Sequence, residues 1–390
     1  GGGEETAEHY VGGNFGTIGG GASNTTTGEF ATVGGGYRNL ARASSATVAG
    51  GWDNEVGTYG GFVGGGTNNR AGGDRWTIVG GYSNAASHDL ASVGGGDHNQ
   101  AAAKRATIAG GSHVAVTGEA AAVGGGEYIT VTGRWAAVGG GVRNHVAPPA
   151  SGMWASVAGT IAGGEGNLVG NAHGTVGGGG NNRAIGYGSV VAGGGGYEHY
   201  GSLLPEWPSA GSTAGGTWST VAGGGRNTAG AYASTVGGGF GNEAVGEFST
   251  VGGGGPEPSE VENPAGPNRA TDAYTTIGGG AGNHAGGLET FPMDASFATV
   301  GGGRHNRATW RAATVAGGEG NTAGAMHATI PGGLGNHATA PQTFAAGTSA
   351  RADHAGAFVW ADADEHPFTS AANNELAARA TGGVRLVLAT

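Results

Sequence analysis

The sequence predicts an all-β fold, a parallel β-roll or β-solenoid with coils of about 15 residues. The first observation is a Val or Ile that recurs every fifteen residues over long stretches, each time before a glycine-rich run. The second is an Asn that usually follows six positions later, as Asn39 follows Val33 and Asn54 follows Val48. The third is composition: glycine makes up 93 of 390 residues, but no Gly-X-Y repeat of the collagen type is present.

The Val or Ile before each glycine run is taken as position zero of a coil and marks the first predicted strand. Small residues such as Ala31 and Ala46 stand two positions earlier. Alternate residues of a strand point the same way, so both columns are expected to face inward. The predicted core includes Val33, Val48, Val93, Val123, Val236 and Val315. The full position-zero column is Ile18, Val33, Val48, Val63, Ile78, Val93, Ile108, Val123, Val138, Ile161, Val176, Val191, Val221, Val236, Val251, Ile277, Val300, Val315 and Ile330, closed by Phe344 and Phe358 at steps of fourteen.

The glycine run is expected to make a tight turn, because φ > 0 is cheap only for glycine. The Asn at position plus six is expected to stack with its equivalents as an amide ladder that caps the turn backbone. Small apolar residues at plus eight, such as Ala41 and Val56, predict a second inward-facing strand before a second turn near Gly57. The predicted ladder contains Asn39, Asn54, Asn69, Asn84, Asn99, Asn227, Asn242, Asn306, Asn321 and Asn336, with Asn24, Asn144, Asn167, Asn182 and Asn283 in the same column.

The outward positions of the first strand predict a flat, uncharged face that packs against another copy of the chain. Position minus one is mostly Thr, minus three is often aromatic, and plus one is Gly or Ala almost throughout. Position plus seven is polar instead, as in Arg70 and Glu243, so that side is expected to face water. The predicted interface is formed by Thr17, Thr32, Thr47, Thr77, Thr107, Thr175, Thr220, Thr235, Thr250, Thr276, Thr299, Thr314 and Thr329, with Phe30, Trp135, Trp218, Phe248 and Phe297.

Composition argues against several classes of function. The net charge of −11 opposes binding to nucleic acid or anionic membranes. The chain has no cysteine, which removes thiolate catalysis and Cys-ligated zinc. No stretch approaches the ~18 apolar residues of a membrane span, so no direct membrane insertion is expected. The sequence starts at Gly1 without Met, as expected of a processed form or an excerpt.

Motifs for catalysis or cofactor binding are absent from the sequence. No Gly-Lys pair exists for a P-loop, and no helix follows the glycine runs for a dinucleotide site. His98 and His113 share the plus-five column on adjacent coils, but two ligands without a third indicate exposed turn histidines rather than a metal site. The acidic residues around His366, from Asp362 to Glu365, are interpreted as a solvated turn. We therefore expect no catalytic, cofactor or metal-binding residues, and no enzymatic activity.

Four insertions interrupt the period, at residues 147–154, 197–209, 256–267 and 288–294. They fall at predicted coil corners, where a solenoid tolerates extra loops. The candidate ligand-binding residues in these insertions are Tyr197, Tyr200 and Trp207. The alternative is that the insertions are surface loops with no binding function. The predicted domains are a β-roll over residues 1–342 and closing coils with a C-terminal cap or neck over 343–390.

The sequence resembles the head repeats of trimeric autotransporter adhesins, the YadA-like head. The stretch "TFAAGTSARADHAGAFVWADA" is most similar, with a fourteen-residue spacing and an alanine-rich second strand. The segment from Phe358 onward is similar to those that close such rolls in bacterial surface and phage-fibre proteins. The resemblance implies a left-handed roll and a homotrimer, with the copies intertwined or side by side. The fifteen-residue period, the triple glycine and the Asn column depart from the family. No segment of this sequence resembles the family's stalk or membrane anchor, so we do not expect this segment itself to attach to a membrane.

These patterns predict a non-enzymatic extracellular or cell-surface protein of a bacterial or phage appendage. It would be a homotrimeric adhesin head or filament subunit that mediates surface attachment. Its partners would be itself, either as a trimer or as an end-to-end polymer, and a host-surface protein or glycan. The alternative is a phage or injection-system tail fibre that binds cell-surface glycans. A minor alternative is ice binding through the Thr column.

Overall fold

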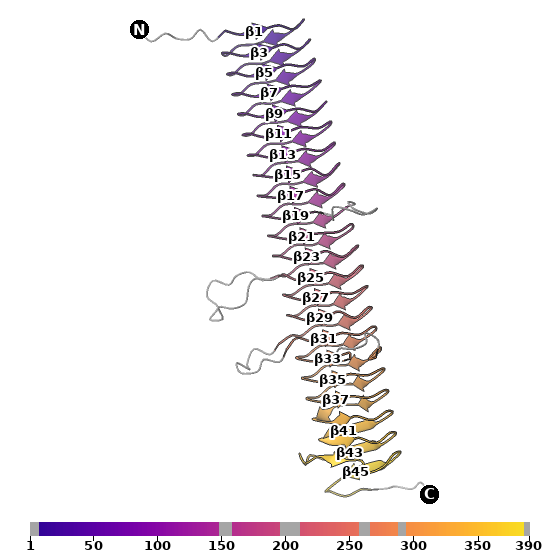
Figure 1. Ribbon diagram of the computed structural model, residues 1–390. Helices are drawn as coiled ribbons and strands as arrows, with labels where there is room; N and C mark the ends of the chain where they lie inside the picture. The colour runs from indigo at the N-terminus through magenta and orange to yellow at the C-terminus, as the bar shows by residue number, and fades with distance from the viewer. Residues whose placement is uncertain (1–7, 148–157, 196–210, 257–265, 288–293, 386–390) are drawn as a thin grey trace, which may run out of the picture. The chain divides into compact units, whose positions relative to one another are not determined.

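The computed structural model describes residues 8–147, 158–195, 211–256, 266–287 and 294–385. The chain divides into two compact units, Gly1–Ala184 and Ile185–Thr390. Both are β-solenoids in which each coil contributes one strand to each of two parallel sheets, so the predicted fold class is confirmed (Figure 1). Among the described residues, no helix is long and apolar enough to cross a membrane.

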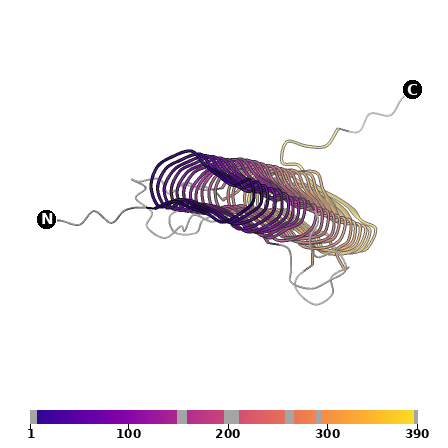
Figure 2. The ribbon, with the colours of Figure 1, turned by 90° about the horizontal axis from the view of Figure 1, so that it is seen from above.

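In the first unit, coils lie over one another as flattened loops, seen in indigo and purple in Figure 2. Its position-zero strands are β2 (Thr17–Ile18), β4 (Thr32–Val33), β6 (Thr47–Val48), β8 (Phe62–Val63), β10 (Thr77–Ile78), β12 (Ser92–Val93), β14 (Thr107–Ile108), β16 (Ala122–Val123), β18 (Ala137–Val138), β20 (Thr160–Ile161) and β22 (Thr175–Val176). The strands of its other sheet are β1 (Tyr10–Val11), β3 (Thr25–Thr26), β5 (Leu40–Ala41), β7 (Glu55–Val56), β9 (Arg70–Ala71), β11 (Ala85–Ala86), β13 (Gln100–Ala101), β15 (Ala115–Val116), β17 (Thr130–Val131), β19 (His145–Val146), β21 (Leu168–Val169) and β23 (Arg183–Ala184).

The second unit repeats this plan and ends in longer strands. Its position-zero sheet contains β24 (Val190–Val191), β26 (Thr220–Val221), β28 (Thr235–Val236), β30 (Thr250–Val251), β32 (Thr276–Ile277), β34 (Thr299–Val300), β36 (Thr314–Val315), β38 (Thr329–Ile330), β39 (Gly333–Leu334), β41 (Phe344–Thr348), β43 (Phe358–Ala361) and β45 (Leu376–Arg379). Its other sheet contains β25 (Thr213–Ala214), β27 (Thr228–Ala229), β29 (Glu243–Ala244), β31 (Arg269–Ala270), β33 (His284–Ala285), β35 (Arg307–Ala308), β37 (Thr322–Ala323), β40 (His337–Ala338), β42 (Ala350–Ala352) and β44 (Phe368–Thr369).

Each described strand pair is parallel and shifted by one coil, so every column of the repeat becomes a continuous row. Thr77 pairs with Ser92, and Ile78 pairs with Val93. The insertions leave this register unchanged. Ala137 pairs with Thr160 on either side of residues 148–157, which lie outside the described residues. The same holds in the second unit, where Val190 pairs with Thr220, Thr250 with Thr276, and Thr276 with Thr299.

The core of each coil consists of the predicted inward columns. Val93 at position zero, Ala91 at minus two and Ala101 at plus eight are all buried, as are their equivalents in most coils. Trp76 is an exception at minus two, where it is 1% exposed. The neighbouring coil makes room for this side chain with Gly61, because a Cβ added at Gly61 would lie 2.3 Å from Trp76 Cζ2. Trp76 Nε1 donates a hydrogen bond of 2.8 Å to Thr58 Oγ1, so its one polar group is satisfied.

The corners differ from the prediction at position minus three. The minus-three residues do not lie on the first strand but in the turn before it, with left-handed backbone, as in Phe30 (φ 56°) and Trp135 (φ 54°). The regular strands contain only positions minus one and zero, so the predicted face is narrower than expected. A third row of single parallel bridges joins the plus-four residues, from Ala22 to Tyr37 to Trp52, and the sequence pattern did not predict it.

The assignment of Phe344 and Phe358 to position zero is wrong. Phe344 pairs with Thr329, so both Phe side chains belong to the minus-one column, and their rings stack outside at 4.3 Å. Ala345 and Val359 take the buried position-zero places instead. The sequence carried a signal for this arrangement, because Phe62 precedes the buried Val63 in a regular coil in the same way.

Candidate partner-binding face

The candidate face follows the position-zero sheet of each unit and is built from the minus-one Thr column and the glycine turn. Because Thr32 and Thr47 pair directly across the sheet, their side chains form an outward row along the coils. Most of these Thr residues are half-buried, and Thr17, Thr107 and Thr276 are exposed. Between neighbouring members, Ser92 Oγ lies 3.4 Å from Thr107 Oγ1. The row therefore presents hydroxyl and methyl groups but no charge.

The glycines at positions plus two and plus three of a turn are subject to different constraints, as Gly50 and Gly51 show. At plus three, Gly51 has φ of +95°, and a Cβ there would lie 2.2 Å from the carbonyl oxygen of Gly66 in the next coil. Its own chain thus requires glycine at that place. At plus two, Gly50 has no neighbouring atom within 4 Å of its Cβ position, and its φ lies outside the range of +20° to +160° that favours glycine. The same is true of Gly110, Gly163, Gly193, Gly223, Gly253 and Gly317.

In eight other coils the plus-two glycine has φ between +147° and +159°, as in Gly20 and Gly178, and that backbone itself favours glycine. The plus-two column is nevertheless glycine in every regular coil, including those such as Gly50 where neither reason applies. At the adjacent plus-one position, by contrast, Ala49, Val79, Ala109 and Pro331 replace glycine. Glycine without a steric or conformational reason inside the chain is expected where another backbone or a ligand approaches closely. The turn backbone beside the Thr row is thus a place that an outside partner can approach.

The aromatic residues of the predicted interface form a separate ridge at the corner. In the second unit, the rings of Phe248, Tyr274 and Phe297 stack in parallel at 5.0 Å between centroids. Phe15 and Phe30 stack in the same way in the first unit. Each ring covers the face of the next, so their exposed parts are mainly edges. Phe30, Trp135, Trp218, Phe248 and Phe297 therefore lie beside the Thr face rather than on it.

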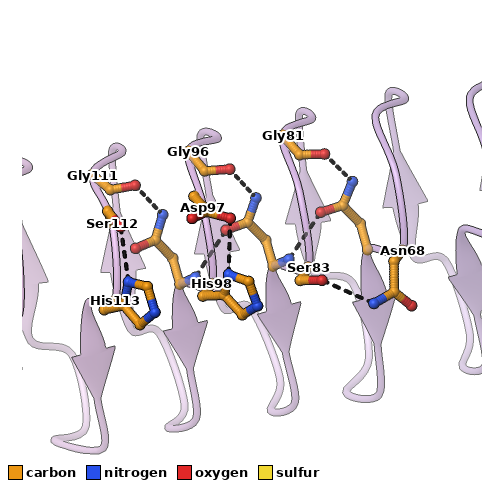
Figure 3. Close-up of polar contacts among 12 residues, drawn as sticks. Asn68, Gly81, Ser83, Gly96, Asp97, His98, Gly111, Ser112 and His113 are labelled. Atoms are coloured by element: carbon orange, nitrogen blue, oxygen red, sulfur yellow. Dashed lines mark hydrogen bonds and ion pairs between the residues drawn. The ribbon is translucent and has the colours of Figure 1, made fainter.

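The Asn column lies inside the coil and holds the glycine turns together. Asn84 is 1% exposed, and its Nδ2 donates to the carbonyl oxygens of Gly80 (3.0 Å) and, in the next coil, Gly96 (2.9 Å). Its Oδ1 accepts a hydrogen bond of 3.0 Å from the N–H of Asn99. Figure 3 shows how the carbonyl groups of Gly81, Gly96 and Gly111 repeat this contact from coil to coil. Hydrogen bonds of this kind involve Asn39, Asn54, Asn69, Asn99, Asn227, Asn242, Asn306, Asn321 and Asn336.

The ladder has one member that the sequence analysis missed and several substitutions. Asn268 occupies plus six after an insertion, and its Nδ2 donates to Gly280 O at 2.8 Å. The triplet Asn268-Arg269-Ala270, which repeats Asn182-Arg183-Ala184, could have revealed it. Val114 and Ile129 replace Asn in two consecutive coils and are fully buried. The column therefore tolerates an apolar pair.

The plus-seven side carries charge, as predicted. Arg42 pairs with Glu55 at 3.2 Å, and Arg269 pairs with Glu243 at 2.9 Å, each across neighbouring coils. Both guanidinium side chains are more than half exposed, so these pairs contribute little stability. Burial, followed by the charges of Arg269 and Arg307, lowers the pKa of His284 in this row.

The candidate ligand-binding residues Tyr197, Tyr200 and Trp207 lie outside the described residues.

Residues 288–293 also lie outside the described residues, but the residues that flank them contact a buried acid. Asp272 is 4% exposed, and its Oδ2 accepts hydrogen bonds from the N–H groups of Ala295 (2.8 Å) and Gly287 (3.3 Å). Burial, followed by the hydrogen bond and charge of Asp272, raises the pKa of Asp294.

The acidic turn after Trp360 is more organised than the sequence suggested. Asp362 Oδ1 accepts from Arg379 Nε at 2.9 Å, and both side chains are largely buried. Arg379 also donates to the carbonyl oxygens of Asp364 and His366. The N–H of Thr381 donates to Asp362 Oδ2, and this bond contributes most to lowering the pKa of Asp362 to about 2. Arg379 was not singled out from the sequence because its partners are mostly backbone groups.

Across the part of the chain that the structure describes, no three His, Asp or Glu side chains gather as a metal site would require. In comparisons with known proteins, no family model matches the chain. No curated protein matches it significantly either.

Proposed function

We propose that this chain is a non-enzymatic structural and adhesive protein that works outside the cell as a homotrimer. A β-solenoid is compatible with such a fibre or adhesive role, because its stacked coils give a long, regular surface. The observation that carries the proposal is the set of plus-two glycines, such as Gly50, Gly110 and Gly163, that neither the sterics nor the backbone conformation of their own chain requires. Their own chain leaves the space above them open, and glycine there permits the close approach of another backbone.

A second copy of the chain suits this face better than other partners. A partner that contacts every coil in the same way must have the same coil-to-coil spacing along its length. A second copy of the chain has this spacing because it has the same sequence and fold. The Thr row beside the glycines is uncharged, so packing would desolvate no ionised group. Three copies related by rotation would bury this face while the charged plus-seven side stays in water.

The remaining parts of the proposal rest on the resemblance to YadA-like heads. On that basis the trimer is an adhesin head or an appendage subunit at a bacterial or phage surface. Attachment to a host-surface protein or glycan would then fall to exposed corners and insertions, where a solenoid accepts variation.

The proposal is tested by light scattering behind a sizing column. We expect three times the 37.4 kDa chain mass for the unmodified protein. Gly110→Leu and Gly163→Leu add side chains into space that is open in a single chain, so each is expected to shift the particle to monomer. Gln100→Leu and Arg183→Leu, on the plus-seven side, serve as matched controls and should remain trimeric.

A monomeric unmodified protein, or Leu variants that remain trimers, would refute this assembly. Monomers would leave the Thr row in solvent and direct attention to surface binding, including ice. A very large and heterogeneous mass would instead indicate an end-to-end polymer.

A further inference from the structure

Stacked aromatic rings at the minus-three corner form an exposed apolar ridge in each unit. In the second unit, Phe248, Tyr274 and Phe297 come from successive coils, and their rings are nearly parallel, 5.0 Å apart between centroids. These side chains remain 42%, 48% and 51% exposed although each ring contacts the next. Phe15 and Phe30 form the same kind of stack in the first unit. A contiguous apolar surface of this kind indicates a contact with another molecule.

Large apolar residues at minus three usually accompany glycine at plus one of the same coil. Position zero is Val or Ile in nineteen coils, and minus three is Phe, Tyr, Trp or Leu in eight of them. Seven of these eight coils have glycine at plus one, compared with four of the other eleven. In the eighth coil, Ala222 follows Trp218, whose ring lies against its own chain, since a Cβ added at Gly188 in the previous coil would be 2.5 Å from it. The seven pairs are Phe15 and Gly19, Phe30 and Gly34, Leu90 and Gly94, Trp135 and Gly139, Phe248 and Gly252, Tyr274 and Gly278, and Phe297 and Gly301.

The structure of a single coil does not explain this link between the two positions. Phe30 lies in the corner before the strand Thr32–Val33, and Gly34 lies in the turn after it, so the two residues are at opposite ends of the strand. A Cβ at Gly34 would lie 2.4 Å from the carbonyl oxygen of Ala49. Ala49 and Val79 nevertheless occupy plus one in other coils, so the solenoid turn can accommodate a side chain there. Linked residues at two separate places of one coil are expected where those places meet between copies of the chain.

From this pattern we propose that the aromatic ridge of one copy packs on the glycine turn, positions plus one and plus two, of the next copy at the same coil. The inference rests on the trimer of the proposed function. In a ring of three, each interface joins two different surfaces, so one side of the face meets the opposite side in the next copy. Rotation about an axis along the coil stack keeps equivalent coils level. The ring of Phe30 then covers the backbone of Gly34 and Gly35 in the neighbouring copy, where no side chain obstructs it.

A second copy of the chain suits the ridge because the spacing of the two surfaces matches. Successive rings such as Phe248 and Tyr274 are 5.0 Å apart because each comes from one coil. The glycine turns of another copy repeat with the same coil spacing, so every ring of the stack meets an equivalent turn. The contact also buries apolar ring edges without desolvating an ionised group.

The proposal is tested by crosslinking of introduced thiols, because the full chain contains no cysteine. The first double variant is Phe30→Cys with Gly35→Cys, and the equivalent pair in the second unit is Tyr274→Cys with Gly279→Cys. Gly35 and Gly279 tolerate a side chain, since the nearest listed atom to a Cβ at each is 3.9 Å away. A short bis-maleimide should convert most of each double variant into a three-chain product on a denaturing gel. The matched control, Phe30→Cys with Leu40→Cys at plus seven, should give at least fivefold less of that product.

Light scattering of the unmodified protein and of each variant separates this inference from the proposed trimer. If the variants are trimers with an intact fold by circular dichroism, but neither pair gives a three-chain product, the ridge contact is wrong and the trimer stands. Crosslinking of Phe30→Cys or Gly35→Cys alone to the same extent as the double variant would also overturn the inference, because a thiol would then meet its own equivalent. A monomeric unmodified protein would refute both the trimer and this contact.

Discussion

In the regular coils the first strand is two residues long, as in β12, and in most of them a buried Asn fixes the glycine turn. In the coils after Ile330, the strands β41, β43 and β45 have five, four and four residues, and the Asn column ends at Asn336. Arg379 there binds backbone carbonyls of the turn that follows β43. A solenoid turn can thus be held by a repeated internal amide, or by longer strands and one charged side chain.

The largest expected effect comes from breaking a glycine turn of a regular coil. Gly51→Ala forces a Cβ to within 2.2 Å of the Gly66 carbonyl oxygen at a φ of +95°. The strain and displacement should lower the free energy of unfolding by roughly 3–6 kcal/mol. Urea unfolding of the two single variants Gly51→Ala and Gly50→Ala measures this at chain concentrations where light scattering shows both to be monomers. Under these conditions Gly50→Ala should leave the stability of the chain nearly unchanged. Equal losses in both would contradict the distinction between the two columns.

The second test concerns the coil in which the buried Trp76 replaces the usual small residue at position minus two. Trp76→Ala should cost about 3–5 kcal/mol, because it leaves a large cavity beside Gly61. Gly61→Ala alone should also destabilise, since its Cβ meets the indole. The double variant restores the Ala pair found in ordinary coils, such as Ala91 and Ala106, and should recover most of the loss. Additive losses in a double-mutant cycle would show that the two residues are not coupled.

The third test removes one amide of the ladder. Asn84→Leu leaves the carbonyl of Gly80 and the N–H of Asn99 without their side-chain partner, at a cost of roughly 3 kcal/mol. Hydrogen exchange should accelerate at Asn99 but not at Phe344, whose N–H bonds to Ala357 O in the closing coils. Val114→Asn, which extends the ladder into an apolar coil, is the matched control and should cost less. Uniform acceleration along the chain would contradict a local role.

The buried columns could be predicted from the sequence because the same type of residue recurs at the same position in most coils. Val93, Asn99 and Ala101 each recur at a fixed offset, and burial in one coil implies burial in the next. The aromatic corner could not be predicted in the same way, because nothing about Phe30 or Trp135 indicates a left-handed backbone. The sequence also does not show which of three consecutive glycines the fold itself requires, because that depends on φ and on contacts with the next coil, as at Gly51.

The smallest effect is expected at the closing coils, where acid should loosen the turn held by Arg379. The folded pKa of Asp362 is about 2, below its ordinary value of 3.8. The carboxylate therefore contributes stability that is fully present above about pH 4 and is lost as the pH falls through 2. Between pH 4 and pH 2, hydrogen exchange should increase at Thr381, whose N–H donates to Asp362.

The control is Asp362→Asn, which cannot titrate. In this variant, exchange at Thr381 should already be fast at pH 5 and should show no step between pH 4 and pH 2 once the intrinsic pH dependence of exchange is subtracted. An acid step of the same size in both proteins would mean that other carboxyl groups, such as Asp364, control the turn. Since regular coils such as the one containing Asn84 are fixed by neutral amides, their exchange should show no comparable step in this range.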